Sequence, residues 1–255
     1  MRIGIIGVGT ISAAIVDGIL NGPQADRVDF ILSPRSVNRV ADLQARYAAV
    51  RVADSNQQVI DESDIVLLAV LPSQMHDVCS DLRFRSEQIV VSLAAGWSVD
   101  AVRDVVKPAG TVCQLIPLPL VKLQIGPIVL FPEVQVVRDL FDGVGQLIVP
   151  ATQSETAAFS TASATMSMLF SVHGAVVEWL TRHGASQAAA YTYVTSLFAG
   201  LMAEAQNADP AERETLVADH ETVGGLNEQV RESLQQAGFF TAIADELDRI
   251  LQRVQ

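Results

Sequence analysis

The chain has 255 residues, a hydrophobic fraction of 49% and a formal net charge of -12. This length permits one large domain or two modest ones, and the composition is that of a globular protein. The negative charge argues against nucleic acid or an anionic membrane as the main partner, because both bind clustered Lys and Arg. No apolar run reaches the roughly 18 residues that span a bilayer, and the start lacks the apolar stretch of a signal peptide. We therefore expect a cytoplasmic protein.

In the first half of the chain, β-rich runs alternate with amphipathic segments. This alternation predicts a Rossmann-type, doubly wound parallel sheet with helices on both faces. The predicted strands are Arg2–Ile6, Asp29–Leu32, Val50–Val52, Ile65–Ala69, Ile89–Ser92, Thr111–Ile116, Ile128–Leu130 and Leu147–Val149. Apolar residues recur at helical spacing in Ile11–Leu20, Val37–Tyr47 and Val134–Leu140.

The character of the sequence changes after Pro150, where Gly, Pro and strand-like runs give way to long Ala-rich segments. We expect a nucleotide-binding domain over residues 1–150 and an all-α domain over residues 151–255. Thr152 and Glu155 have the spacing of a capping box, so a long helix is expected to begin there. The last predicted helix carries an apolar stripe of Phe240, Ile243, Leu247, Ile250, Leu251 and Val254. That stripe needs a partner surface, either in the same chain or in a second subunit.

A glycine-rich loop follows the first predicted strand and leads directly into a helix. It reads Gly7-Val8-Gly9-Thr10-Ile11-Ser12. In such a loop the first glycine permits a tight turn, and the second lets the backbone approach a pyrophosphate at the helix N-terminus. The context of strand, loop and helix predicts a dinucleotide site. The alternative is a glycine turn without a ligand.

The end of the second predicted strand indicates which dinucleotide is bound. NAD-binding folds usually place Asp or Glu there, whereas a 2′-phosphate is held by Arg. This chain has Ser33-Pro34-Arg35-Ser36. An Arg between two serines offers charge-assisted hydrogen bonds to a phosphate, which predicts NADP(H) with Ser33, Arg35 and Ser36 as contacts. The alternative is a solvated surface Arg.

Neither the cysteines nor the histidines form a recognisable metal or disulfide pattern. Cys79 and Cys113 stand in apolar surroundings, which predicts reduced core thiols. His76, His173 and His183 have no carboxylate or Cys partners at ligand spacing. We therefore expect no metal site.

Several motifs now resemble the pyrroline-5-carboxylate reductase family over nearly the whole chain. The opening strand, glycine loop and helix are similar to those of the family. Ala69-Val70-Leu71-Pro72 is similar to the family's Ala-Val-Lys-Pro, and Ser92-Leu93-Ala94-Ala95-Gly96 to its Ser-x-Ala-Ala-Gly. Gly224-Gly225 falls where the family has Pro-Gly-Gly-Thr-Thr in its helical domain.

The resemblance implies an NADP-dependent reductase that transfers hydride to the C=N bond of a small cyclic imine, as in proline biosynthesis from 1-pyrroline-5-carboxylate. It also implies cofactor contacts at Asn56, Ala69, Val70, Pro72, Ala94, Ala95 and Gly96. In the family the helical domain forms dimers that build the active site across the interface. A homodimer or a larger homo-oligomer is therefore implied.

Departures from the family concentrate where substrate should bind. Met-Pro-Asn-Thr-Pro is here Ile116-Pro117-Leu118-Pro119-Leu120, and Ser-Gly-Ser-Gly-Pro-Ala is here Ser163-Ala164-Thr165-Met166-Ser167-Met168. Ser-Pro-Gly-Gly-Thr-Thr is here Thr222-Val223-Gly224-Gly225-Leu226-Asn227. The loss of these polar groups bears on substrate specificity, because a site that binds a substrate through its polar atoms discriminates poorly between substrates once its own polar groups are gone.

Reduction of a protonated imine requires orientation and a carboxylate anchor more than a strong general base. The candidate anchors are backbone N–H groups around Gly224-Gly225, with Thr222 and Asn227 as side-chain donors. The alternative is a plain glycine-rich helix junction. His220 could donate a proton, although we favour a structural, partly buried imidazole with satisfied hydrogen bonds.

Three other functions fit parts of the sequence. A β-hydroxyacid dehydrogenase would place a Lys on the first long helix after the Rossmann domain, but the only lysines are Lys107 and Lys122. A non-catalytic NADP(H)-binding regulatory protein would keep the cofactor cleft and lose the substrate groups. A reductase of a more apolar imine or carbonyl would use an apolar pocket of Leu118, Leu120, Met166 and Leu226.

Overall fold

The computed structural model describes residues 1–254, and for Val254 the backbone alone. The described chain forms two compact units, Met1–Thr161 and Ala162–Gln252. The division falls at the end of a helix that the sequence analysis places at the start of the second domain. The functional boundary between residues 150 and 151 stays a prediction.

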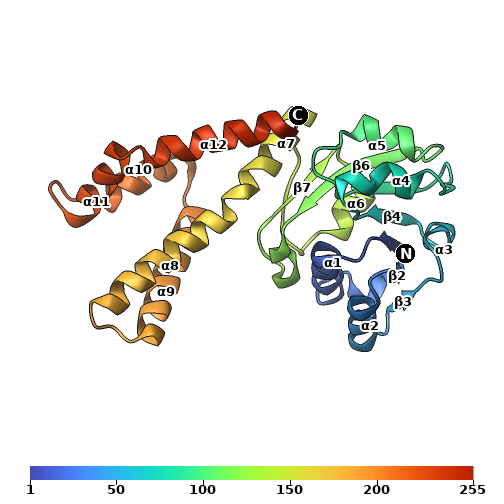
Figure 1. Ribbon diagram of the computed structural model, residues 1–255, viewed down its shortest axis with the longest axis horizontal. Coiled ribbons are helices and arrows are strands. Elements are labelled where there is room, and N and C mark those ends of the chain that lie inside the picture. The colour runs from blue at the N-terminus through green and yellow to red at the C-terminus, as the bar shows by residue number, and fades with distance from the viewer. Residues whose placement is uncertain (255) are drawn as a thin grey trace. The chain divides into compact units, whose positions relative to one another are not determined.

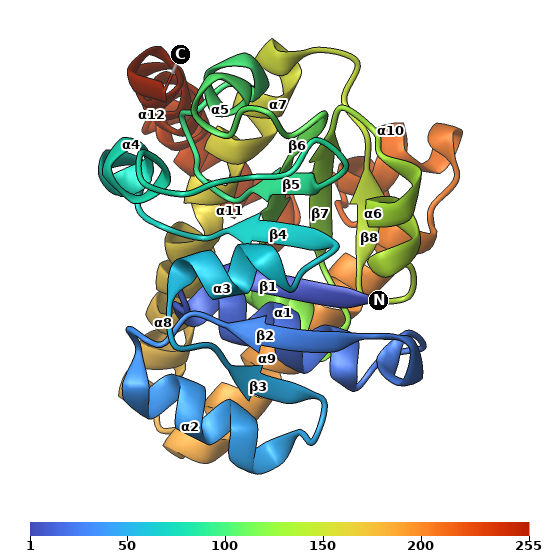
Figure 2. The same ribbon diagram turned by 90° about the vertical axis from the view of Figure 1, so that its right-hand side faces the viewer.

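The first unit is an eight-stranded sheet in the order β3-β2-β1-β4-β5-β6-β7-β8, and Figure 2 shows its strands side by side. The strands are β1 (Arg2–Ile6), β2 (Asp29–Leu32), β3 (Val50–Val52), β4 (Ile65–Leu68), β5 (Ile89–Ser92), β6 (Thr111–Pro117), β7 (Pro127–Phe131) and β8 (Gln146–Ile148). Each of the eight predicted strands is confirmed to within one residue. The predicted Rossmann-type class is confirmed as well.

The sheet is parallel from β3 to β6, but β7 runs antiparallel to β6, with Ile116 opposite Val129. A parallel neighbour needs a crossover of about a dozen residues or more. Only residues 118–126, which include the 3-10 turn Pro119–Leu123, connect the two strands, so the chain returns in the opposite direction. The sequence does not reveal this reversed pair, because β7 is a continuous apolar run like the buried parallel strand β4.

Helices cover both faces of the sheet, as predicted. They are α1 (Thr10–Leu20), α2 (Val37–Arg46), α3 (Asn56–Asp61), α4 (Met75–Cys79), α5 (Val99–Val105) and α6 (Gln135–Leu140), followed by α7 (Gln153–Ala162). Helices α1, α2 and α6 pack on one core and α3, α4 and α5 on the other. Alternate residues of a strand serve the two cores, as Leu67 and Leu68 do in β4.

Thr152 caps α7 as the capping-box spacing predicts, since its hydroxyl oxygen accepts a hydrogen bond from the Glu155 N–H at 3.1 Å. The Glu155 carboxylate accepts from the Ala151 N–H at 2.8 Å, one residue earlier than expected. The helix itself is shorter than predicted. A 3-10 turn at Ser163–Thr165 separates it from the next helix.

The second unit consists of α8 (Met166–Arg182), α9 (Gln187–Asn207), α10 (Pro210–Asp219), α11 (Leu226–Gln236) and α12 (Phe239–Val254), as Figure 1 shows. Part of the apolar stripe of α12 has a partner within this unit. Ile243, Leu247 and Ile250 line an apolar cavity of about 280 Å³ together with Met168 of α8. Phe240 is exposed and the Val254 side chain lies outside the described residues.

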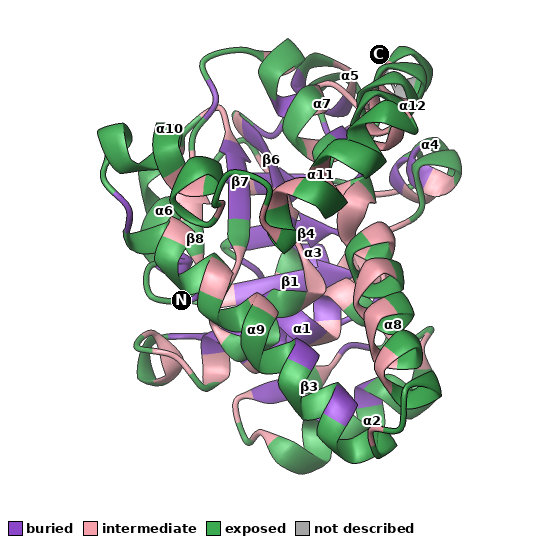
Figure 3. Ribbon diagram, turned by 90° about the vertical axis from the view of Figure 1, so that its left-hand side faces the viewer, coloured by how far each residue is buried: buried purple, intermediate pink, exposed green. Residues whose placement is uncertain are grey.

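Burial differs sharply between the two units. Buried positions follow the strands of the first unit, whereas α8 and α9 are almost wholly exposed or intermediate (Figure 3). Among the described residues of the second unit, the buried apolar ones are Ala190, Val194 and Ala208. No helix in the described part of the chain is long and apolar enough to cross a membrane.

Candidate functional site

In the glycine loop between β1 and α1, the fold requires Gly7, whereas Gly9 leaves open space in front of the helix N-terminus. Gly7 has φ +92°, and a Cβ there would lie 2.6 Å from the Ala69 carbonyl oxygen, so no other residue fits. Gly9 is the N-cap of α1, and a Cβ there would meet no atom within 4 Å. No side chain caps the helix. The open space therefore lies in front of uncapped backbone N–H groups, which suits an anion.

Two serines hold this loop in place. The Ser33 hydroxyl oxygen accepts a hydrogen bond from the Gly7 N–H at 3.0 Å, and the Ser12 hydroxyl donates to the Gly7 carbonyl at 2.7 Å. The exposed fractions of the two side chains are only 2% and 1%. Both serines thus hold the loop in its conformation, and the cofactor contacts expected of them stay predictions.

A cavity of about 540 Å³ opens over this loop at the carboxyl ends of the central strands. Of the predicted cofactor residues, eleven line it: Gly7, Gly9, Ser33, Arg35, Ser36, Asn56, Ala69, Val70, Pro72, Ala94 and Ala95. Thr10, Ile11 and Ser12 lie in the first turn of α1 and do not line the cavity, and Gly96 lines a neighbouring one. The structure therefore gathers most of a set that the sequence spreads over some ninety residues.

Arg39 lines the same cavity and was missed by the sequence analysis. Its guanidinium donates to the Val8 carbonyl at 3.3 Å and to the Thr10 hydroxyl at 3.5 Å, so it lies across the glycine loop. The spacing of four residues from Arg35 was the available signal. No Asp or Glu is among the residues that line the cavity. Asp42 lines a neighbouring pocket together with both arginines, but its carboxylate pairs with Arg46 at 2.9 Å.

The turn after β5 forms another wall of the cavity through Ala94 and Ala95. Gly96 has φ +79°, a conformation that favours glycine. The Trp97 indole N–H donates to the Pro72 carbonyl at 3.1 Å and so joins this turn to the segment after β4.

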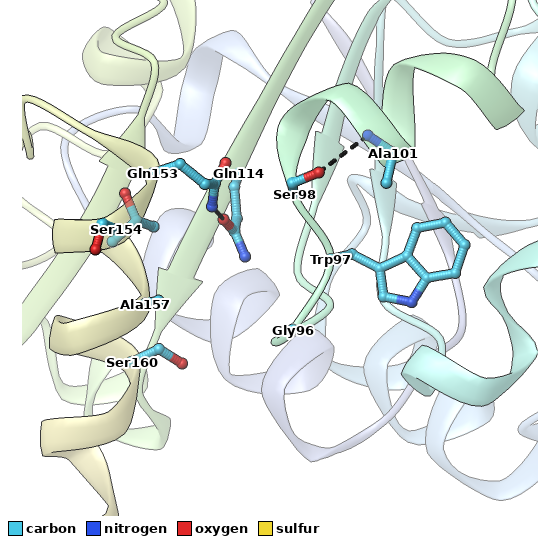
Figure 4. A pocket seen from close by; sticks show the side chains of 10 residues that line it. Gly96, Trp97, Ser98, Ala101, Gln114, Gln153, Ser154, Ala157 and Ser160 are labelled. Atoms are coloured by element: carbon cyan, nitrogen blue, oxygen red, sulfur yellow. Dashed lines mark hydrogen bonds between the residues drawn. The ribbon is translucent and has the colours of Figure 1, made fainter. Parts of the chain in front are cut away.

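Beyond the turn lies a second cavity of about 540 Å³, which Figure 4 shows between the turn, β6 and α7. Its lining includes Gln114 and Gln153 and contains no charged side chain.

The proposed catalytic residues Thr222, Asn227 and His220 all lie in the second unit, at the junction of α10 and α11. The Asn227 side chain donates to the His220 carbonyl at 2.7 Å, so its amide is already engaged within the chain. A Cβ at Gly225 would lie 2.3 Å from the Thr222 hydroxyl oxygen, which explains the glycine there. The three residues are brought together, but as parts of a compact helix junction.

The two glycine N–H groups expected to anchor a substrate carboxylate have partners in the structure. The Gly225 N–H donates to the Thr222 carbonyl at 2.7 Å, and the Gly224 N–H donates to the Glu228 carboxylate. Glu228 therefore places a negative charge at the N-terminus of α11. A substrate carboxylate bound there has to compete with this side chain.

His220 is exposed rather than partly buried, and both ring nitrogens have partners. Nδ1 lies 2.9 Å from the Leu216 carbonyl oxygen, and Nε2 lies 3.2 Å from the Glu204 carboxylate. The pKa of the imidazole is raised above its ordinary value, first by the Leu216 carbonyl and then by the charge of Glu204. These contacts favour the structural role preferred in the sequence analysis, with a proton held in place.

The two cysteines are free thiols, and the described residues form no cluster of metal ligands. Cys79 and Cys113 are buried and free, and burial raises the pKa of their thiols to about 11 and about 12, respectively. Among the described residues, no group of three or more His, Cys, Asp or Glu side chains is arranged to hold a metal ion.

A Rossmann-type sheet with an open glycine loop, followed by a helical unit, is an architecture found among nicotinamide-dependent oxidoreductases. The family described as NADP oxidoreductase, coenzyme F420-dependent, matches residues 2–96. The chain is 25% identical to the pyrroline-5-carboxylate reductase of Methanosarcina acetivorans in an alignment of 273 positions, which covers 99% of this chain and 96% of that protein.

Two solved structures share the fold over the whole chain. The 1-pyrroline-5-carboxylate reductase of Streptococcus pyogenes has a TM-score of 0.85 at 22% identity, covering 100% of this chain and 98% of that one. The Plasmodium falciparum pyrroline carboxylate reductase, solved with NADP bound, has a TM-score of 0.84 at 15% identity, covering 100% and 97%. In sequence and in fold, the chain is therefore similar to pyrroline-5-carboxylate reductases over nearly its whole length.

Proposed function

We propose that this chain uses NADPH to reduce the C=N bond of a small cyclic imine, with 1-pyrroline-5-carboxylate, which gives proline, as the first candidate. The observation that carries the proposal is the single cavity shared by the open Gly9 loop, the two arginines and the Ala94-Ala95 turn. The pyrroline-5-carboxylate reductases among its relatives support the same reaction. A cytoplasmic location and a role in proline biosynthesis stay predictions.

The preference for NADP(H) over NAD(H) rests on Arg35 and Arg39. Both guanidinium groups are exposed and line a cavity without a carboxylate. A ribose 2′-phosphate can receive charge-assisted hydrogen bonds from them, whereas a free 2′-hydroxyl gains much less. The relative solved with NADP bound supports this assignment.

The chain's own residues work mainly by binding and orientation. Gly9, at the N-terminus of α1, would hold the pyrophosphate in the open space in front of it, and Ala69, Val70 and Ala94 would form the wall beyond it. The bound nicotinamide supplies the hydride. A protonated imine already carries the positive charge that the reaction needs, so no strong general base is required of Thr222 or His220.

A homodimer, or a larger homo-oligomer built through the second unit, is part of the proposal. Exposed apolar side chains there include Phe170, Met202 and Leu226, at 77%, 66% and 81% of their full exposure. A helical unit with so few buried apolar residues needs a partner surface. Sedimentation velocity should therefore show a species of at least twice the monomer mass, and a monomer at all concentrations would contradict this part.

One observation favours a second candidate, a reductase of a more apolar imine or carbonyl that lacks a carboxylate. The Glu228 carboxylate accepts a hydrogen bond from the Gly224 N–H at the α11 N-terminus, and its negative charge would repel a substrate carboxylate there. Leu118 and Pro119 also stand where the family has the polar residues Asn and Thr. Such an enzyme would reduce 1-pyrroline in preference to 1-pyrroline-5-carboxylate.

The test is NADPH oxidation with each of the two imines in turn. The first candidate predicts a larger kcat/KM for 1-pyrroline-5-carboxylate, and the second predicts a larger kcat/KM for 1-pyrroline. NADPH binding without turnover of either imine would contradict both and would favour the non-catalytic regulatory protein.

A further inference from the structure

Two glutamine side chains connect the cofactor-lining turn to α7. The Gln114 side chain, from β6, donates through Nε2 to the Ala94 carbonyl at 3.2 Å. Its Oε1 accepts a hydrogen bond from Gln153 Nε2 at 3.0 Å. Gln153, in the first turn of α7, accepts in turn from the Val99 N–H at 3.1 Å. Figure 4 shows the two amides facing each other.

The chemistry at the two ends of this chain of hydrogen bonds fixes the direction of both amides. The Val99 N–H can only donate, and the Ala94 carbonyl can only accept. Gln153 must therefore present its oxygen to Val99 and its nitrogen to Gln114, and Gln114 must present its nitrogen to Ala94. Rotating either amide by 180° would place two donors or two acceptors against each other.

The link is shielded from water at its centre. Gln114 lies on the same face of β6 as the buried Val112, and its exposed fraction is only 3%. A buried polar group that loses its partner costs about 1–3 kcal/mol, so each amide strongly constrains its neighbours. The Ala94 carbonyl lies in the turn that, with Ala95, lines the cofactor cavity.

We propose that Gln114 and Gln153 are positioning residues that hold the Ala94–Gly96 turn in the conformation that receives the cofactor and tie it to α7. This proposal rests on the proposed binding of NADPH in the cavity over the glycine loop. Neither side chain touches that cavity, so both act through the turn.

The hydrogen-bond direction decides which substitutions break the link. Gln114→Glu keeps the acceptor for Gln153, but an ionised carboxylate cannot donate to the Ala94 carbonyl. Protonation of that carboxyl group restores a donor. Gln153→Glu keeps the acceptor for the Val99 N–H. Its second carboxylate oxygen would then face the Gln114 Oε1, and neither of these two oxygens can donate a hydrogen bond.

Gln88 provides a matched control for the general cost of a buried carboxylate. It is also a buried glutamine, directly before β5 at the end away from the turn, with an exposed fraction of 1%. Its Oε1 accepts from the Arg85 N–H at 2.9 Å, and its Nε2 donates to the Ile60 carbonyl at 2.7 Å. Gln88→Glu therefore makes the same chemical change far from the turn.

The experiment is a titration of the full-length protein with NADPH, followed by fluorescence, with thermal unfolding recorded for every variant. At about pH 8, Gln114→Glu and Gln153→Glu should each raise the Kd for NADPH about tenfold. The Kd of Gln114→Glu should return towards the wild-type value at about pH 6, where a buried carboxyl group becomes protonated. Gln88→Glu should lower the Tm and leave the Kd unchanged.

A double variant tests the link itself. In Gln114→Arg with Gln153→Glu, the first position only donates and the second only accepts, so all three contacts can form again. The double variant should bind NADPH more tightly than Gln153→Glu alone. If Gln114→Glu does not fold, Gln153→Glu and the double variant still give the comparison, because Gln153 is only half-buried.

Two results would overturn the proposal. Unchanged Kd values in both single Glu variants, with the wild type binding NADPH, would reduce the link to a purely structural contact. A wild type that binds no NADPH would instead overturn the proposed function, and the positioning role with it.

Discussion

The Ser33 hydroxyl oxygen accepts a hydrogen bond from the Gly7 N–H at 3.0 Å, which joins the end of β2 to the glycine loop after β1. Both residues line the cofactor cavity. The segment expected to recognise the 2′-phosphate and the segment expected to receive the pyrophosphate are therefore one hydrogen-bonded unit.

Replacement of Ser33 by Ala should destabilise the fold, because it leaves the Gly7 N–H without its acceptor in a part-buried place. The free energy of unfolding should fall by about 1–3 kcal/mol in urea denaturation. Ser36→Ala is the matched control, since the Ser36 side chain makes no cap hydrogen bond to α2. Equal stability losses in the two variants would contradict the role assigned to Ser33.

Gly9 and Gly7 should respond to alanine in opposite ways. Gly9 has an extended backbone, φ -94° and ψ -168°, and open space around a new Cβ. Gly9→Ala should therefore fold with a nearly unchanged Tm but lose NADPH affinity about tenfold or more, because the methyl group enters the place of the pyrophosphate. Gly7→Ala should lose stability, because its Cβ meets the Ala69 carbonyl. Unaltered NADPH binding by Gly9→Ala would indicate that the pyrophosphate does not bind in the space in front of Gly9.

Glu228 offers a test of substrate charge at the α11 N-terminus. Glu228→Gln removes a negative charge beside the Gly224 N–H. If a substrate carboxylate binds there, the KM for 1-pyrroline-5-carboxylate should fall several-fold while the KM for 1-pyrroline stays the same. Glu232→Gln, one turn further along α11, is the control. A common change in both KM values would argue against carboxylate binding at this helix end.

The raised pKa of His220 predicts a specific dependence on pH. Because the folded-state pKa lies above the unfolded one, the contribution to stability is complete below the ordinary imidazole pKa and is lost as the pH rises through the raised value. Glu204→Gln should lower the pKa in an NMR titration of the ring, but only in part, because the Leu216 carbonyl remains. An unchanged pKa in that variant would show that Glu204 does not contribute.

The sequence predicts the first unit well because its signals are local. Strand boundaries, the glycine loop and Arg35 all follow from short-range patterns, and the structure gathers most of these residues in one cavity. Arg39 was missed because its approach to Val8 depends on how α2 packs beside α1, which no single segment encodes. The antiparallel direction of β7 was missed because its continuous apolar run does not show which way the strand runs.

The second unit illustrates the opposite situation. Its all-α character and its last helix were expected from the sequence, but the roles of Asn227 and Glu228 depend on hydrogen bonds made across a short junction. The motif alone suggested free N–H donors at Gly224 and Gly225. The structure shows that the chain's own acceptors already use them.

The most direct test of the central claim is a titration of the wild-type protein and of Arg35→Ala with Arg39→Ala, using NADPH and NADH. The account predicts that the wild type binds NADPH at least about tenfold more tightly than NADH, and that the double variant loses this preference while its affinity for NADH changes little. A wild type that binds neither dinucleotide, or that prefers NADH, would contradict it.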